Sequence, residues 1–148
     1  RAWDESAAGT SKSAMTVRSS GTQPIHIEQD VVLARQTARK LATECGMRLI
    51  DLTKMVTAVS ELARNTMVYG GGGDMDWQIL DEDHKVGLRL TFRDEGPGIA
   101  DIKLAMTDGW TSGSGMGLGL TGAKRLVQEF ELDTEPGKGT RITITRWT

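Results

Sequence analysis

Apolar residues recur at helical spacing in two stretches of the first half of the chain. The first stretch follows Asp30, a good N-cap residue, and ends at Gly46; its apolar members are Val31, Leu33, Ala34, Ala38, Leu41 and Ala42. The second follows Asp51, and its expected buried face is formed by Leu52, Met55, Val56, Val59, Leu62, Ala63 and Met67. The spacing predicts two amphipathic helices.

Alternating patterns predict the strands. Ile25 and Ile27 mark a first strand within 16–27, and the segments 77–80 and 86–92 form a hairpin joined by the polar turn 81–84. A short helix is expected at 102–106, a longer helix from Leu118 to about Glu131, and a last strand carrying Ile142 and Ile144 after the turn 136–139. This order predicts an α/β two-layer sandwich, a mixed β-sheet with helices packed on one face.

Composition narrows the class of protein. The 148 residues suit one core, with a tail or expression remnant at 1–20 and a single domain at 21–148. The net charge of −2 lacks the basic footprint of nucleic-acid binding, and the one cysteine, Cys45, excludes an intramolecular disulfide. Because no apolar run approaches 18 residues, no membrane span is expected, and a cytoplasmic location is the default.

Glycines cluster in one window. Of the chain's 18 glycines, seven lie between Asp94 and Thr121, and an apolar helical pattern follows them directly. Since glycine is costly to order, such a cluster favours backbone that approaches a ligand, with N–H groups turned toward phosphate. A flexible loop is the alternative. The run 70–73 is interpreted as a plain linker.

Two candidate chemical groups stand before this window. Glu61 and Asn65 are four residues apart and share one helical face, where a carboxylate and an amide oxygen could orient a nucleophile and bind Mg²⁺; a solvent-facing polar pair is the alternative. Asp94 ends a predicted strand, and there its carboxylate can accept a hydrogen bond from an exocyclic amine. The glycines beside it leave room for a flat ring.

Four motifs together resemble the GHKL (Bergerat) ATP-binding fold of DNA gyrase and histidine kinases. They are 61–65 (ELARN), 94–98 (DEGPG), 113–119 and 137–140 (GKGT). Within that fold the chain is most similar to the anti-sigma serine/threonine kinases, in particular the stressosome switch kinases, and the likeness covers about 25–147.

The resemblance implies a role for each matching residue. Glu61 would be the general base, Asn65 would hold Mg²⁺ against the phosphates of ATP, and Asp94 would bind the adenine amino group. The other residues that the motifs imply for nucleotide binding are Gly96, Gly98, Ile99, Gly113, Gly115, Met116, Gly117, Leu118, Gly119 and Thr140.

The resemblance also implies partners. The substrate would be a STAS-domain antagonist, and a PP2C-type phosphatase or a sigma factor could be bound afterwards in a partner-switching response; a homodimer is left open. Many members carry a basic residue where this chain has Val68, so Arg64, Lys124 or Arg125 would have to supply cationic help. A non-catalytic ATP-gated binding module and a histidine-kinase catalytic domain remain alternative functions.

Overall fold

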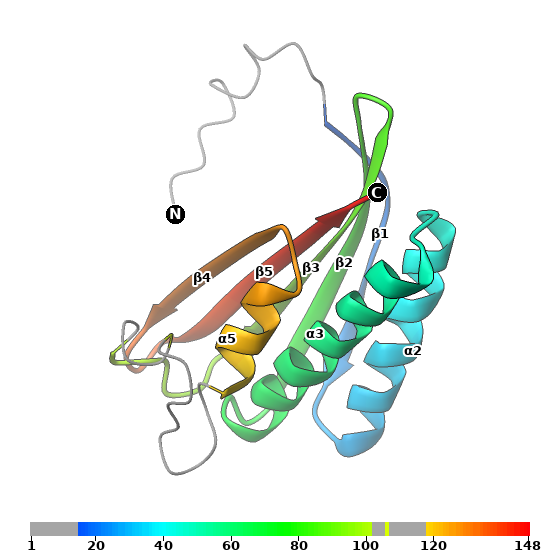
Figure 1. Cartoon of the computed structure of the whole chain (residues 1–148). Coiled ribbons are helices and arrows are strands. Elements are labelled where there is room, and N and C mark those ends of the chain that lie inside the picture. Colours follow the sequence, from blue (N-terminus) through cyan, green and yellow to red (C-terminus); the bar gives the residue numbers. More distant parts are fainter. Residues whose placement is uncertain (1–14, 102–105, 107–117) are drawn as a thin grey trace.

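The computed structural model describes residues 15–101, 106 and 118–148, and the fold has two layers (Figure 1). The helices α2 (Glu28–Glu44), α3 (Leu49–Val68) and α5 (Leu118–Arg125) cover one face of a five-stranded sheet. The strands are β1 (Thr16–Ile25), β2 (Gly73–Glu82), β3 (Lys85–Asp94), β4 (Glu129–Glu135) and β5 (Gly139–Trp147). Their order is β1-β2-β3-β5-β4. The two-layer sandwich is confirmed. The sequence predicted a mixed sheet, and all four pairings between the described strands are antiparallel.

Both long helices begin earlier than the sequence predicts. Asp30 lies in the first turn of α2, where its carboxylate accepts the backbone N–H groups of His26 and Ile27. α3 begins at Leu49, and Asp51 lies in its first turn with its carboxylate 2.5 Å from Nη2 of Arg146. In both helices an acidic residue that suits the N-cap occupies a first-turn position, where the helix dipole also favours negative charge.

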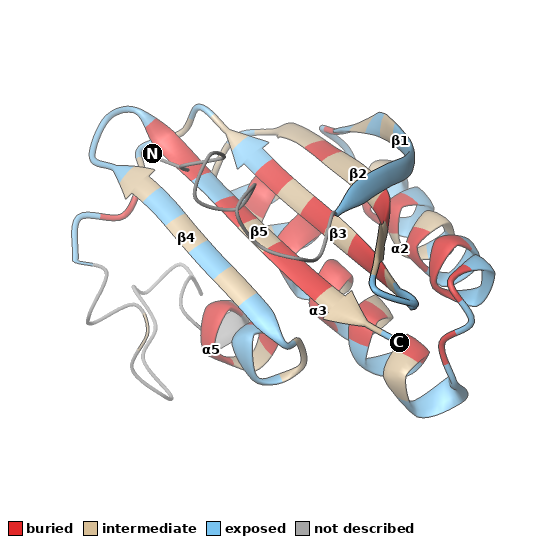
Figure 2. Cartoon of the chain, turned by 90° about the horizontal axis from the view of Figure 1, so that it is seen from above, coloured by how far each residue is buried: buried red, intermediate tan, exposed pale blue. Residues whose placement is uncertain are grey.

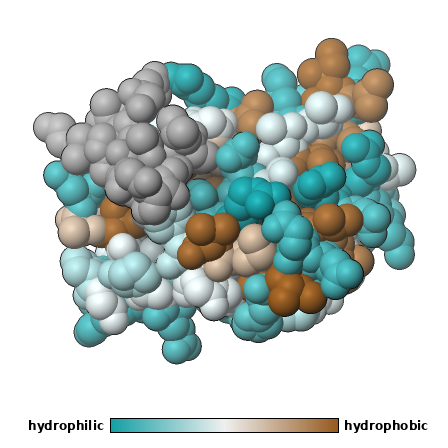
Figure 3. All heavy atoms as spheres, turned by 90° about the horizontal axis from the view of Figure 1, so that it is seen from below, coloured by the Kyte–Doolittle hydropathy of each residue, from teal (hydrophilic) through white to brown (hydrophobic). Residues whose placement is uncertain are grey.

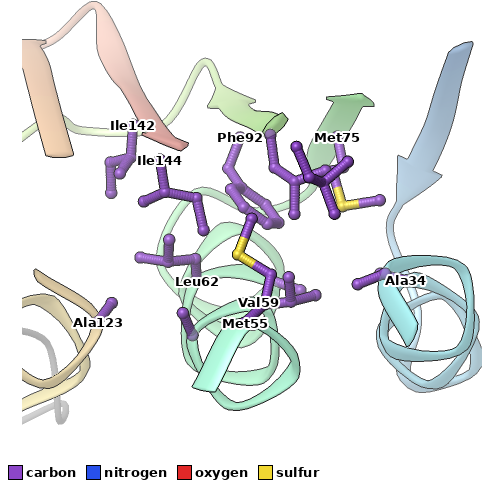
Figure 4. Packing of buried hydrophobic residues seen from close by; sticks show 14 of the residues in the cluster. Ala34, Met55, Val59, Leu62, Met75, Phe92, Ala123, Ile142 and Ile144 are labelled. Atoms are coloured by element: carbon purple, nitrogen blue, oxygen red, sulfur yellow. The ribbon is translucent and has the colours of Figure 1, made fainter. Parts of the chain in front are cut away.

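The core lies between the layers (Figure 4). Met55, Val59 and Leu62 of α3 point toward the side chains of Phe92 and Met75, among others, on the sheet. All five are buried almost completely. Seen from above, the central strands alternate between buried and more exposed positions, as expected for a sheet with one covered face (Figure 2).

The predicted helix from Leu118 to about Glu131 is wrong in its second half. α5 ends at Arg125, and residues 129–135 form the edge strand β4. Leu126, Val127 and Phe130 continue the helical spacing, but from 129 onward acidic and less polar residues alternate strictly. The burial of β4 alternates in the same way, because one face packs toward the helices and the other faces solvent.

The remaining strands agree with the expectations and extend them. β1 begins at Thr16, so four residues of the predicted tail pair with β2: Thr16, Val17, Ser19 and Ser20. The β2–β3 hairpin turns tightly at Asp83 and His84, which both adopt positive φ angles (48° and 68°). The predicted helix at 102–106 lies almost wholly outside the described residues. Among those that are described, no helix is long and apolar enough to cross a membrane.

One register row positions the candidate site. At one end of the sheet, Ile25, Gly73, Asp94, Thr140 and Thr134 are successive cross-strand partners from β1 to β4. Antiparallel partners on one face lie about 5 Å apart. The row therefore brings three polar side chains, from β3, β5 and β4, side by side beneath the C-terminal end of α3.

Candidate functional site

Asp94 is the centre of the row. It is half-buried, and its Oδ1 accepts the backbone N–H of Gly96 at 2.9 Å. Burial raises the pKa of the Asp94 carboxyl, and hydrogen bonds from the N–H groups of Gly96 and Thr140 oppose that rise. The carboxylate is thus held in one orientation, and as an acceptor it can receive a further donor from a ligand.

Gly70 allows α3 to end directly against Asp94. A Cβ added at Gly70 would lie 2.3 Å from Cβ of Asp94, and one added at Gly96 would lie 2.7 Å from Cα of Gly70. Gly73 belongs to β2 and pairs with Asp94. The interpretation of 70–73 as a plain linker is therefore wrong for Gly70 and Gly73, because both are required where helix, strand and carboxylate meet.

The segment after Asp94 is docked on the β4–β5 turn. Gly98 has a φ of +73°, and a Cβ there would lie 2.1 Å from the carbonyl oxygen of Glu135. Gly137 donates its N–H to the carbonyl of Pro97 at 2.7 Å. Ile99 is buried and anchors the end of the segment. These contacts fix Gly96, Gly98 and Ile99 between Asp94 and the β4–β5 turn, and their part in nucleotide binding stays a prediction.

Thr134 joins the three parts of this wall. Its Oγ1 lies 2.9 Å from the backbone nitrogen of Ile99, 2.9 Å from the carbonyl oxygen of Gly139 and 2.9 Å from Oγ1 of Thr140. Thr134 was not predicted from the sequence, because the residues before it continue a helical spacing. The alternation along 129–135 was the signal that could have placed it beside Thr140.

Asn65 lies on α3 beside the row. Its main-chain oxygen accepts the N–H groups of Tyr69 and Gly70 at 2.9 and 3.2 Å. Its side-chain Nδ2 is buried and has no hydrogen-bond partner among the described residues. Because a buried amide normally has its hydrogen bonds satisfied, this orphaned group fits a ligand, with one end of the amide available to a metal ion or its waters and the other to an acceptor.

Glu61 stands one turn before Asn65 on α3 and is exposed. In the described part of the chain, its carboxylate makes no hydrogen bond. No group of three or more His, Cys, Asp or Glu side chains in the described part of the chain could hold a metal by itself. An ion held mainly by phosphates and water, with Asn65 as the protein ligand, needs no such group.

Arg64 is paired with a residue of α2. Its guanidinium bonds the carboxylate of Glu28 on α2, with Nη2 and Oε1 2.7 Å apart. Among the candidates for cationic help, Arg64 is therefore engaged between helices, and Lys124 is exposed near the end of α5.

An open cleft of about 770 Å³ lies at the same end of the sheet. Asp94, Thr134, Thr140 and Gly70 line it together with charged side chains of the strand ends, whereas Glu61 and Asn65 do not. The predicted residues Gly113, Gly115, Met116 and Gly117 lie outside the described residues. Leu118 and Gly119 open α5.

Comparisons with known proteins identify relatives of this chain. The family model of the histidine kinase-, DNA gyrase B- and HSP90-like ATPases matches residues 50–147. The chain is 42% identical to the serine/threonine-protein kinase RsbT of Bacillus subtilis, over 83% of this chain and 92% of RsbT. It is 30% identical to the anti-sigma F factor of Bacillus licheniformis, over 81% of this chain and 86% of that protein.

Two solved structures share the fold. The RsbU and RsbW domains of a Mycobacterium tuberculosis protein align with a TM-score of 0.55 and 20% identity, covering 92% of this chain and 32% of that one. The SiaB–SiaC complex of Pseudomonas aeruginosa aligns with a TM-score of 0.53 and 12% identity, covering 89% and 91%. The match to the family model covers well over half of the chain, so this protein belongs to the histidine kinase-, DNA gyrase B- and HSP90-like ATPase family.

Proposed function

We propose that this protein is an ATP- and Mg²⁺-dependent protein serine/threonine kinase of the anti-sigma, partner-switching type. The observation that carries the proposal is the placement of the half-buried, oriented Asp94 carboxylate beside the α3 end that bears Asn65 and its orphaned amide. The similarity to RsbT along almost its whole length supports the kinase reading over a histidine-kinase domain.

Each side chain has a distinct part in the proposed reaction. Asp94 accepts a hydrogen bond from the adenine amino group, and Gly98 lets the segment after Asp94 pack against Glu135, with which a side chain at this position would collide. Asn65 presents its amide to the phosphate end of the nucleotide. Mg²⁺, when bound, neutralises charge on the phosphates.

Glu61 takes the proton of the substrate hydroxyl. Its exposure suits this part, because a protein substrate must reach the carboxylate from outside. General-base catalysis of this kind contributes about 10²–10⁴-fold to the rate.

The proposed substrate is a STAS-domain antagonist protein, phosphorylated on serine or threonine in the cytoplasm. Exposed apolar side chains suited to protein contact occur near α3's C-terminal end, where Ile27 is 54% and Val68 57% exposed. Figure 3 shows this end of the molecule, where apolar groups are scattered among polar ones. After transfer, the kinase would release this partner and bind another, such as a PP2C-type phosphatase or a sigma factor.

The direct test is transfer of labelled γ-phosphate from ATP·Mg²⁺ to STAS-domain proteins encoded near this chain, followed by mapping of the labelled residue. The proposal predicts label on a serine or threonine. The matched control is Glu61→Gln, which keeps the size and polarity of the side chain but cannot take a proton.

Label that is absent with every candidate substrate, while ATP still binds, would support the non-catalytic ATP-gated module instead. Label on a histidine would support the histidine-kinase alternative.

A further inference from the structure

The hydroxyl group of Thr134 has all of its hydrogen-bonding capacity occupied. A threonine hydroxyl offers one proton and two acceptor lone pairs. Three polar atoms surround Oγ1 of Thr134, each at 2.9 Å: the backbone nitrogen of Ile99, the carbonyl oxygen of Gly139 and Oγ1 of Thr140. The three polar atoms thus match the one proton and two lone pairs of the hydroxyl.

The direction of each bond follows from the chemistry of the partners. The carbonyl of Gly139 can only accept, so it takes the proton of Thr134. The N–H of Ile99 can only donate, so it occupies one lone pair. The remaining lone pair of Thr134 can be filled only if Thr140 donates its own proton to it.

Thr140 therefore has no proton left for a ligand. Its hydroxyl is buried in the row next to Asp94, its cross-strand partner, and both residues line the same cleft. Toward a ligand, the Thr140 hydroxyl can therefore only accept hydrogen bonds. The neighbouring carboxylate of Asp94, when ionised, can likewise only accept them. The two side chains form an acceptor pair.

We infer that Thr134 is a positioning residue that makes the site selective for an amino group. By holding the proton of Thr140, it prevents this hydroxyl from turning to donate to a carbonyl oxygen. A 6-aminopurine such as adenine places two hydrogens against the acceptor pair, whereas a 6-oxopurine places an acceptor there. The inference rests on the proposed binding of ATP at Asp94 and deepens it by naming what sets base selectivity.

The experiment compares ATP with inosine triphosphate, in which an oxo group replaces the 6-amino group. Dissociation constants are measured by calorimetry on the full chain, on Thr134→Val and on Thr134→Ser. Valine keeps the shape of threonine without the hydroxyl, so Thr140 becomes free to donate; serine keeps the hydroxyl.

The full chain should prefer ATP by about tenfold to a hundredfold, since the oxo group would be left unpaired against acceptors. Thr134→Val should lower this preference by about tenfold, and Thr134→Ser, which keeps the hydroxyl, should leave it close to that of the unaltered chain. A merely structural role of Thr134 would weaken both nucleotides together and leave their ratio unchanged. An unchanged ratio in Thr134→Val would therefore overturn the inference.

A second variant keeps the test decisive if Thr134→Val does not fold. In Thr140→Val the acceptor that opposes the oxo group is gone, so the preference for ATP should fall. If Thr140 instead donates to the oxo group, the preference will stay the same or rise, which overturns the inference. Absence of ATP binding to the unaltered chain would refute the proposed function itself, and the two failures are thus distinguishable.

Discussion

The two halves of the candidate site differ in how firmly the protein holds them. At the sheet end, Asp94 and Thr140 are held by backbone and side-chain hydrogen bonds, and Thr134 is saturated with partners. On α3, Glu61 is exposed, and the buried amide nitrogen of Asn65 has no hydrogen-bond partner in the part of the chain that the structure describes.

Under the proposed function, this difference implies that nucleotide recognition and phosphoryl transfer depend on separate parts of the site. The sheet end is organised before any ligand arrives, which suits a part of the ligand that does not change during the reaction. The helix half would be completed by ligand groups, which suits phosphates and a protein substrate that bind and leave. Substitutions in one half should therefore affect one property and spare the other.

The largest expected effect is on transfer. Glu61→Gln removes the proposed base and, in the described part of the chain, breaks no hydrogen bond, so the rate of phosphoryl transfer should fall by about 10²–10⁴-fold. Single-turnover transfer to the substrate protein measures it. A rate within a few-fold of the unaltered chain would show that Glu61 is not the base.

Gly70→Ala should disturb the sheet end. The added methyl would lie 2.3 Å from Cβ of Asp94, so the helix end or the carboxylate must shift. We expect a loss of about 1–3 kcal/mol in the free energy of unfolding, measured by urea denaturation, together with weaker ATP binding.

Gly122→Ala in α5 is the control, because a Cβ there meets no heavy atom within 4 Å. The control should be neutral or stabilise by up to about 1 kcal/mol. Equal effects at both positions would contradict the packing described.

Asp94→Asn should change how the stability of the protein depends on pH. The folded-state pKa of Asp94 is raised above 3.8, so ionisation of this group opposes folding, and its contribution to stability falls as pH rises through the folded-state pKa. Asparagine keeps an oxygen for the N–H groups of Gly96 and Thr140 and does not ionise. The free energy of unfolding of the variant, relative to that of the unaltered chain, should therefore be higher at neutral pH than at a pH below 3.8. Urea unfolding at both pH values tests this, and the opposite trend would refute the assigned cause of the shift.

Arg64→Ala should have the smallest effect. The ion pair with Glu28 is largely solvent-exposed, at 48% and 61% of the two side chains, and such pairs contribute at most about 1 kcal/mol to stability. ATP affinity should remain unchanged, because the guanidinium bonds α2. A strong loss of ATP affinity would instead identify Arg64 as a phosphate contact.

Local periodicity predicted much of the fold. The apolar stripe of α3, the alternation of β3 and β5, and the position of Asp94 at a strand end could all be read without a structure, because each depends on neighbouring residues. Helix starts were misplaced because Asp30 and Asp51 act from the first turn of their helices, and both positions are compatible with acidic side chains.

What could not be predicted depends on register. Gly70 matters only because β2 and β3 bring Asp94 against the end of α3. Thr134 matters only because β4 pairs with β5 so that it meets Thr140. β4 itself was missed because Leu126, Val127 and Phe130 happen to continue a helical spacing. Contacts across strands leave little trace in the spacing along one strand.

The most direct test of the separation is the dissociation constant of ATP·Mg²⁺, measured by calorimetry side by side for Asp94→Asn and Glu61→Gln. Asp94→Asn weakens a charge-assisted hydrogen bond to the base, so its dissociation constant should rise by about tenfold to a hundredfold. That of Glu61→Gln should stay close to the unaltered value. Equal weakening in both variants, or weakening in Glu61→Gln alone, would contradict the assignment of recognition to the sheet end and transfer to α3.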